Sequence, residues 1–395
     1  MTTVDSCSVG APTAPWPSQR NRRSALVAQF GTERADLLQW ALTTGDPLMD
    51  AVVTDMYGPH PGARDAFHRG IREGVESLDD PPESVKALLA HVEARPPYAD
   101  EKLIERGAVA FFNNDPTVHL VSLSAGALVR VCESPSIAAV LTQTGRVVDG
   151  ASKRIEQAGK WLLSVMTPDS LRVGEPGYVA TLQFRLLHAK MRRCARNRSY
   201  DEDAHGTPIN QIDMARTWID FTMTSFKAED EMGFGLSSHE IADSYQYWWY
   251  VGHLLGIDPQ LVEGISSNAE AARVDQMLQS VTGPVISESA LLAQATLSSV
   301  ADVLAAQLRV PRSVSERVLN ALTRRFHGPT SGDELGVPST PVVSAAVARA
   351  TRQIRRRRDA LRQDEIKWDR EQAENLAKTR RALEQPWHEF AGGKP

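Results

Sequence analysis

The sequence predicts an all-α protein whose helices form one large domain. Apolar residues recur at spacings of three and four along most of the 395-residue chain, which is the period of amphipathic helices. Prolines and capping residues punctuate these segments, and signals for strands are weak. Strands and helices do not alternate, and the glycine-rich phosphate-binding motifs are missing, so a nucleotide-binding α/β fold has no support.

The predicted helices follow one another with short breaks. Helices are expected near residues 34–57, 63–77, 83–94, 101–111, 151–166, 177–196, 208–228, 237–256, 258–281, 285–307, 311–326 and 339–382. Ser84 and Asp100 are candidate N-caps. Prolines mark further boundaries at Pro116, Pro168, Pro176, Pro208 and Pro311. The stretch 119–125 is the best candidate strand, although its small residues also suit a buried helix.

Three parts are expected along the chain. Residues 1–24 are predicted to form a flexible tail, because residues 1–20 are rich in Ser, Thr, Pro and Gly and lack apolar periodicity. Residues 25–335 are predicted to form the helical domain. Residues 336–395 are predicted to form a long charged C-terminal helix and a tail.

The C-terminal helix carries a basic run at 352–358, followed by interleaved acidic residues. Opposite charges at spacings of three and four support an exposed helix. We favour a solvated helix that packs through Leu361 and Trp368, or a contact between subunits, over a patch for RNA or an anionic surface. We prefer these two interpretations because acidic residues lie among the basic ones and the whole chain has a net charge of −5.

Composition excludes several classes of protein. The net charge of −5 gives no reason to expect nucleic-acid binding. The three cysteines, Cys7, Cys132 and Cys194, are too far apart for a disulfide framework or a CxxC metal site. No apolar run approaches the roughly 18 residues of a membrane span. The apolar stretch after Arg22 and Arg23 is too short for an export signal, so a cytoplasmic protein is expected.

Metal chemistry in such a chain would depend on its ten histidines. His188 lies on the predicted helix 177–196, one turn after Arg185 and beside an apolar face. A neutral imidazole there can bind iron, and an arginine can meet a carboxylate. Haem b offers both partners, an iron and two propionates. The spacing alone leaves two alternatives open, an iron ligand and a packing residue. A lone histidine on an amphipathic helix is more often a packing residue.

Several motifs resemble the latex-clearing protein family of haem b oxygenases over about residues 30–330. They are Gly45-Asp46-Pro47 with Asp50-Ala51-Val52-Val53, Thr144-Gly145-Arg146, Gly177-Tyr178-Val179-Ala180-Thr181, Arg185-Leu186-Leu187-His188-Ala189 and Val251-Gly252-His253-Leu254-Leu255-Gly256. The resemblance implies a globin-like helical core with additional helices. It also implies haem b as the cofactor, with O2 or peroxide as co-substrate.

The resemblance assigns roles to five residues. His188 falls on the family's proximal iron ligand, and Arg185 on an arginine of the same helix that would pair with a propionate. Arg154 matches the arginine of the distal helix, and Gln157 stands where the family has a lysine. An amide binds iron poorly but can hydrogen-bond to bound oxygen. Arg154 and Gln157 are therefore the expected catalytic residues, facing the distal pocket or the second propionate, and Arg154 is also an expected haem-binding residue. Thr222 is a further expected contact at the distal side.

The function that the resemblance implies is a haem-dependent oxygenase or oxidase. The expected substrate is a small, largely apolar or aromatic intracellular molecule, in secondary metabolism. One alternative is a polyisoprene-cleaving dioxygenase, which the lost lysine and the expected cytoplasmic location disfavour. A second alternative is a non-enzymatic haem-binding sensor or scaffold. The family's catalytic glutamate has no aligned match here, and Glu133 and Glu156 are the nearest candidates.

Other candidates are weaker. Tyr245, Tyr247, Trp248, Trp249 and Tyr250 form an aromatic cluster that is expected to pack at a helix junction, with a pocket lining as the alternative. His253 is a second candidate ligand. A di-iron bundle needs a repeated Glu-x-x-His, a c-type haem needs CxxCH, and a zinc hydrolase needs HExxH, and the chain has none of these patterns. The oligomeric state is left open.

Overall fold

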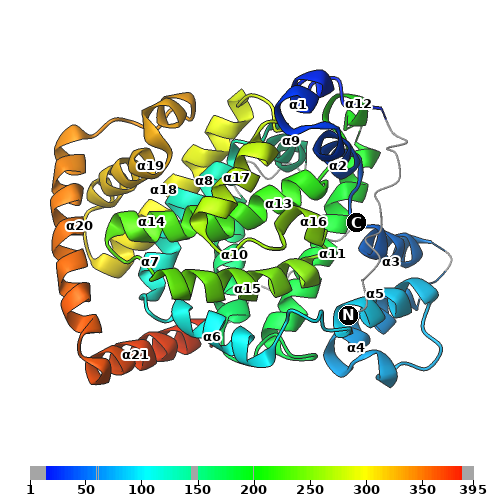
Figure 1. Ribbon diagram of the computed structural model, residues 1–395, viewed down its shortest axis with the longest axis horizontal. Coiled ribbons are helices and arrows are strands. Elements are labelled where there is room, and N and C mark those ends of the chain that lie inside the picture. Colours follow the sequence, from blue (N-terminus) through cyan, green and yellow to red (C-terminus); the bar gives the residue numbers. More distant parts are fainter. Residues whose placement is uncertain (1–14, 59, 61, 144–149, 199, 385–395) are drawn as a thin grey trace.

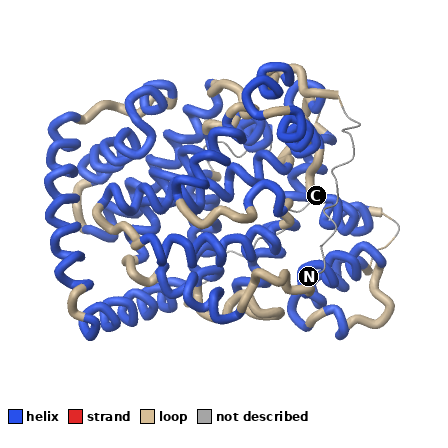
Figure 2. Tube along the Cα trace, in the orientation of Figure 1, coloured by secondary structure: helices blue, strands red, loops and turns tan. Residues whose placement is uncertain are grey.

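The computed structural model describes residues 15–58, 60, 62–143, 150–198 and 200–384. Every regular element within these ranges is a helix (Figure 2). The predicted all-α class is therefore confirmed. The stretch 119–125 is helical as well, because its small residues pack inside the fold rather than pair with another strand.

Twenty-one α-helices lie within the described ranges. They are α1 (Arg23–Phe30), α2 (Thr32–Thr43), α3 (Pro47–Tyr57), α4 (Ala63–Glu73), α5 (Glu83–Glu93), α6 (Glu101–Phe111), α7 (Pro116–Val121), α8 (Val129–Cys132), α9 (Pro135–Gln143), α10 (Ala151–Met166), α11 (Pro176–Asn197), α12 (Glu202–His205), α13 (Gln211–Ile219), α14 (Ser225–Met232), α15 (Ser238–Leu255), α16 (Pro259–Val262), α17 (Asn268–Gln279), α18 (Ser287–Leu308), α19 (Arg312–Glu334), α20 (Pro341–Arg362) and α21 (Glu365–Leu383).

Helices α10, α11, α13 and α15 form the centre of the molecule (Figure 1). The first five helices lie at one end and α18–α21 at the other. The aromatic cluster of α15 is part of the core, since Tyr245, Tyr247 and Trp248 are each at most 2% exposed. The central helices are therefore packed by large aromatic side chains, which bury the most apolar area per residue.

Two π-helical turns interrupt the central helices. The turn η2 (Ser122–Leu128) joins α7 to α8, and η3 (Asp220–Thr224) joins α13 to α14. The two turns pack against each other, and η2 also packs against α14, where a Cβ atom on Gly126 would lie 3.3 Å from the Cβ of Ala228. The single helix predicted over 208–228 therefore contains a change of winding. Such turns are frequent at functional sites.

The first described residues pack against the domain. Arg20 is 6% exposed, and its guanidinium donates hydrogen bonds to the carbonyls of His205, Val281 and Thr282. Arg23 begins α1 and its Nε donates to the side chain of Gln39. Residues 15–24 therefore do not belong to the flexible tail that was predicted for 1–24.

The single long C-terminal helix predicted over 339–382 is wrong. Helix α20 ends at Arg362, and Asp364 caps the start of α21 by accepting a hydrogen bond from the backbone N–H of Lys367. The two helices meet at an angle along one edge of the molecule (Figure 1). The Trp368 ring lies under the guanidinium groups of Arg358 and Arg362, at 5.1 and 4.6 Å, and so packs the corner.

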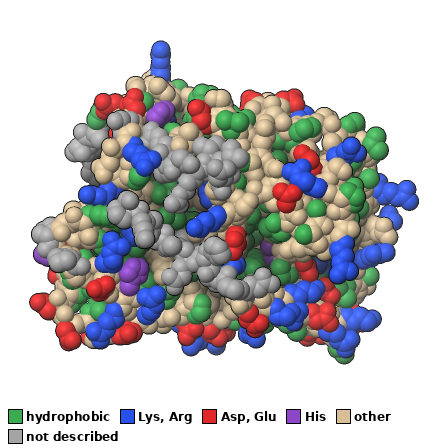
Figure 3. Space-filling view, turned by 180° about the vertical axis from the view of Figure 1, so that it is seen from behind, with side chains coloured by type: hydrophobic (Ala, Val, Ile, Leu, Met, Phe, Trp, Pro, Cys, Tyr) green, Lys and Arg blue, Asp and Glu red, His purple; other side chains and the backbone are tan. Residues whose placement is uncertain are grey.

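Part of the basic run packs against the domain. Arg355 of this run pairs with Asp230, and Arg362, one turn beyond the run, pairs with Glu240. Elsewhere on the surface, acidic and basic side chains lie among one another, as the view from behind shows (Figure 3). The helix thus has an inner side that contacts α14 and α15 as well as an exposed side.

Among the described residues, helix α18 is the one helix that is long and apolar enough to cross a membrane, by length and composition only. It has 22 residues, and its most apolar window has a mean hydropathy of 1.4. The bent pair Pro116–Cys132 and Pro135–Thr142, at 93° to each other, reaches the same level only when taken together. Much of the hydropathy of α18 comes from alanines. Its Leu292 and Val300 are fully buried in the core.

Candidate active site

A deep cavity lies among α8–α11, α13, α15 and α18. The space between its side chains is about 1340 Å³, part of it open to solvent. Its walls are mostly apolar, and the Trp161 ring stands at their centre. Trp161 stacks on Phe184 at 5.2 Å between ring centroids and meets Phe221 and Trp248 edge-on at 5.5 and 6.1 Å. The cavity therefore suits a large apolar occupant.

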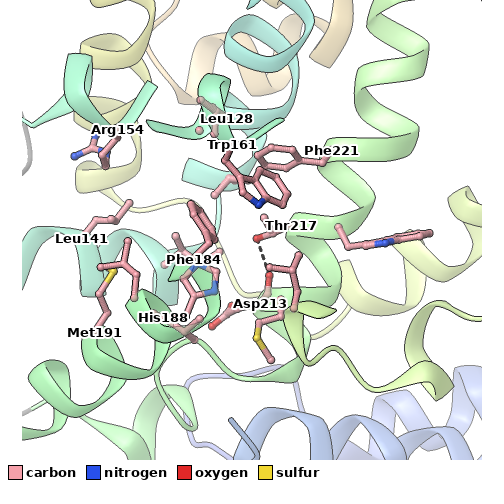
Figure 4. Close-up of a pocket in the computed structure, with 18 of the residues that line it drawn as sticks. Leu128, Leu141, Arg154, Trp161, Phe184, His188, Met191, Asp213, Thr217 and Phe221 are labelled. Carbon is pink, nitrogen blue, oxygen red and sulfur yellow. Dashed lines mark hydrogen bonds between the residues drawn. The ribbon is translucent and has the colours of Figure 1, made fainter. Parts of the chain in front are cut away.

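His188 lines this cavity from α11 (Figure 4). The ring of Phe184, one turn earlier, meets the imidazole edge-on at 4.8 Å between centroids. Burial lowers the pKa of His188 to about 4, and the nearby positive charge of Arg192 adds to this effect. Neither ring nitrogen has a hydrogen-bond partner among the described residues. The imidazole is therefore neutral near pH 7, with a lone pair that faces no protein donor.

Arg154 and Gln157 line the same cavity from α10. They are three residues apart, so both lie on one side of that helix. The helices α10 and α11 pack side by side, which brings these two residues and His188 to a common space. The structure thus assembles three of the five predicted site residues.

Arg185 does not reach this cavity. Its Nε and Nη2 donate to the two carboxylate oxygens of Asp46 at 2.6 and 2.8 Å, and its Nη1 donates to the Leu254 carbonyl at 3.2 Å. Both charged side chains are 2% exposed. The structure does not support the predicted pairing of Arg185 with a propionate in this cavity, because the residue does not line it and its charge is already paired with the buried Asp46.

The ion pair explains the motif Gly45-Asp46-Pro47. Asp46 caps α3 by accepting a hydrogen bond from the Met49 N–H, and Pro47 begins the helix. Burial by itself would raise the pKa of Asp46, but the charge and hydrogen bonds of Arg185 outweigh burial and hold the pKa below its ordinary value. This part of the motif is thus structural.

Thr222 and His253 do not line the cavity that contains His188. Thr222 is in η3, where its hydroxyl donates to the Trp218 carbonyl at 2.8 Å, and it does not line the cavity. This contradicts its predicted distal contact, because the hydroxyl bonds back to its own helix. His253 lines a second pocket, where its ring lies 4.6 Å from that of His91 between centroids. Burial lowers the pKa of His253 to about 4.

The two candidate glutamates differ in environment. Glu156 is 46% exposed and pairs with Lys160. Glu133 is largely buried, and its Oε1 has no hydrogen-bond partner in the described structure. Burial raises the pKa of Glu133 to about 7, against the opposing charges of Arg130 and Arg216. Neither glutamate lines the cavity.

Asp213 is a cavity residue that the sequence analysis missed. It lines the cavity from α13 and is 2% exposed (Figure 4). Its Oδ1 accepts hydrogen bonds from the hydroxyls of Ser136 and Ser134 at 2.6 and 3.3 Å. An acidic residue on the apolar side of an amphipathic helix was the signal available in the sequence, since such residues are almost never buried without a partner.

Comparison with known families identifies the class of protein to which this all-helical chain belongs. Residues 110–356 match the family described as the catalytic domain of ER-bound oxygenase mpaB/B' and rubber oxygenase. This match covers more than half of the chain, so the protein belongs to that family of oxygenases. The resemblance to latex-clearing proteins is thereby confirmed.

A solved structure of latex clearing protein LCP in the closed state has a similar fold. The TM-score is 0.63, the match covers 86% of this chain and 90% of that chain, and the sequence identity is 17%. At this identity the likeness shows the fold alone. A comparison with curated protein sequences gives no match.

Proposed function

We propose that this protein is a haem b-dependent oxygenase that acts on a small, largely apolar molecule, with His188 as the ligand of the haem iron. One observation carries the proposal. A neutral imidazole without a hydrogen-bond partner in the described structure faces a large apolar cavity. A neutral imidazole can bind a metal through its unprotonated nitrogen.

The residues of the cavity fit haem b. The cavity is lined mostly by apolar side chains and is partly open to solvent, as suits a haem whose apolar faces are covered and whose propionates reach polar groups. The flat side chains of Trp161 and Phe184 suit contact with a macrocycle. Arg154 is the only arginine or lysine among the described lining residues, and it would hold a propionate.

The protein's own residues would bind the haem and orient the co-substrate. His188 would hold the iron, and haem, when bound, supplies the chemistry that activates O2 or peroxide. Gln157 carries an amide that both donates and accepts hydrogen bonds, and we assign it to orient the co-substrate in the cavity. The apolar walls exclude water and favour an apolar substrate. Family membership as an oxygenase favours an enzyme over a sensor or scaffold.

The absorbance spectrum of the purified protein tests this proposal. Protein produced with ample haem should show a Soret band and a b-type pyridine haemochrome. His188→Ala should lose or strongly weaken the band, while His253→Ala, in the second pocket, should keep it. Colourless wild-type protein, or an unchanged spectrum in His188→Ala, would overturn the proposal. The cytoplasmic location and the role in secondary metabolism stay predictions.

A further inference from the structure

We propose that the second pocket, which His91 and His253 line, binds an organic cation, a tertiary or quaternary ammonium group, against its aromatic and acidic side chains. The space between the side chains of this pocket is about 990 Å³, part of it open to solvent. Among the described lining residues, Ile257 is the only one that the pocket shares with the cavity of His188. The two spaces can therefore take different molecules, and the inference goes beyond the proposed function.

Three aromatic side chains from distant parts of the chain line this pocket. They are Trp40 of α2, Tyr98 between α5 and α6, and Trp249 of α15. All three are partly exposed, and the rings of Tyr98 and Trp249 stand at right angles with 5.6 Å between centroids. Trp248, next along α15, lines the cavity of His188 instead. The faces of Trp and Tyr rings attract cations, so this wall suits a positively charged group with apolar substituents.

The charged side chains of the lining also favour a cation. Those in the described part of the pocket are three carboxylates and one guanidinium, from Asp46, Asp258, Glu263 and Arg185. Asp46 and Arg185 pair with each other, which leaves the other two carboxylates without an ion-pair partner within the described ranges. A cation in the pocket is therefore attracted by the lining, and an anion is repelled.

Glu263 lies close to the aromatic wall. Burial raises the pKa of Tyr98 to about 12, and the negative charge of Glu263 adds to this effect. Glu263 itself is exposed, so it stands where the pocket meets solvent. Asp258 is fixed at the start of α16 (Pro259–Val262), where its Oδ1 accepts a hydrogen bond from the backbone N–H of Gln260 at 2.9 Å. Both free carboxylates thus come from the segment that follows α15.

The two histidines add no positive charge near neutral pH. Burial lowers the pKa of both imidazoles, that of His253 to about 4, and the charge of Arg185 acts in the same direction. The Nε2 of His253 lies 3.2 Å from the carbonyl oxygen of His91. No group of three or more metal-binding side chains is found among the described residues. An organic cation therefore fits the pocket better than a metal ion does.

Choline and 3,3-dimethylbutan-1-ol test this inference, because the two molecules have nearly the same shape and only choline is charged. Calorimetric titration of the purified full-length protein with each molecule measures the preference. The ionic strength is held constant, because salt screens exposed charges. Wild type should bind choline about 2-fold to 30-fold more tightly than the neutral alcohol.

Matched variants separate the aromatic and the acidic contributions. Tyr98→Leu removes one ring and should reduce the preference for choline by about 2-fold to 5-fold, while Tyr98→Phe keeps the ring and should keep most of the preference. Glu263→Gln should also reduce the preference, because it removes a negative charge close to this ring. Glu316→Gln, whose side chain is 48% exposed on α19 and outside the pocket, is the control and should bind as wild type does.

Equal binding of choline and the alcohol by wild type, or no binding of either, would overturn the inference. A preference that folded Tyr98→Leu and Glu263→Gln proteins both keep would overturn it as well, because choline would then bind elsewhere. Binding of Zn²⁺ that His91→Ala abolishes, without a preference for choline, would instead assign the pocket to a metal ion. None of these measurements depends on a Soret band, so their failure is distinguishable from failure of the proposed function.

Discussion

The buried pair of Arg185 and Asp46 gives the sharpest stability prediction. We consider Arg185→Met, which keeps an unbranched apolar side chain and removes the guanidinium. The wild-type side chain makes three hydrogen bonds, two of them to a carboxylate that is 2% exposed. Removal leaves the Asp46 carboxylate buried without its cation, and breaking a buried pair in this way costs about 3–5 kcal/mol.

The expected shift in Tm follows from the size of the protein. An unfolding entropy of about 2.1 cal/mol/K per residue gives about 0.8 kcal/mol/K for a chain of 395 residues. A loss of about 3–5 kcal/mol then lowers Tm by about 4–6 °C. Thermal unfolding followed by far-ultraviolet circular dichroism measures this. The double variant Asp46→Asn with Arg185→Met should recover part of the loss, because no buried charge is then left alone.

Arg69→Met is the matched control, because Arg69 pairs with Glu73 at the surface, with 52% and 55% of the side chains exposed. Its Tm should change by about 1 °C or less. Haem content should be unchanged in Arg185→Met. An unchanged Tm together with a lost Soret band would refute our assignment and restore a role for Arg185 at the haem.

Three further changes test other parts of the structure. Gln157→Leu should lower turnover while keeping the Soret band, and unchanged turnover would remove Gln157 from the site. Burial lowers the pKa of His327 to about 4, so the unfolded state takes up this proton at a higher pH than the folded state. The free energy of unfolding should therefore fall as the pH drops from about 6.5 toward 4. His327→Gln should flatten this part of a denaturation series measured against pH, and an unchanged slope would contradict the prediction. Glu229→Gln should cost about 1–3 kcal/mol by urea unfolding, because the buried carboxylate accepts hydrogen bonds from His119, Ser122 and Asn114, and an amide has only one oxygen to accept them. A loss well below about 1 kcal/mol would show that these hydrogen bonds are not needed.

The helical class and most helix positions were predictable from the spacing of apolar residues. The break between α20 and α21 was not, because the pattern of exposed charge continues through it. The break depends on Asp364 acting as a cap and on Trp368 packing under two arginines. Likewise the π-helical turn η3 keeps a helical pattern of residues while changing the winding.

Site residues could be predicted from the sequence only where they share one helix or one helix face. Arg154 and Gln157 share a side of α10, and the structure brings them to the cavity with His188. Arg185 is three residues before His188, which turns it about 60° around α11 and away from the cavity. Its true partner, Asp46, is 139 residues away along the chain, and no local pattern reveals such a pairing.

The central claim is that His188 holds the haem iron, and rescue of a cavity variant tests it most directly. His188→Gly removes the imidazole and leaves space beside the cavity. We predict one b-type haem per wild-type chain by pyridine haemochrome, loss of the Soret band in His188→Gly, and its return when free imidazole is added. A His188→Gly protein that keeps the wild-type spectrum without imidazole would contradict the claim.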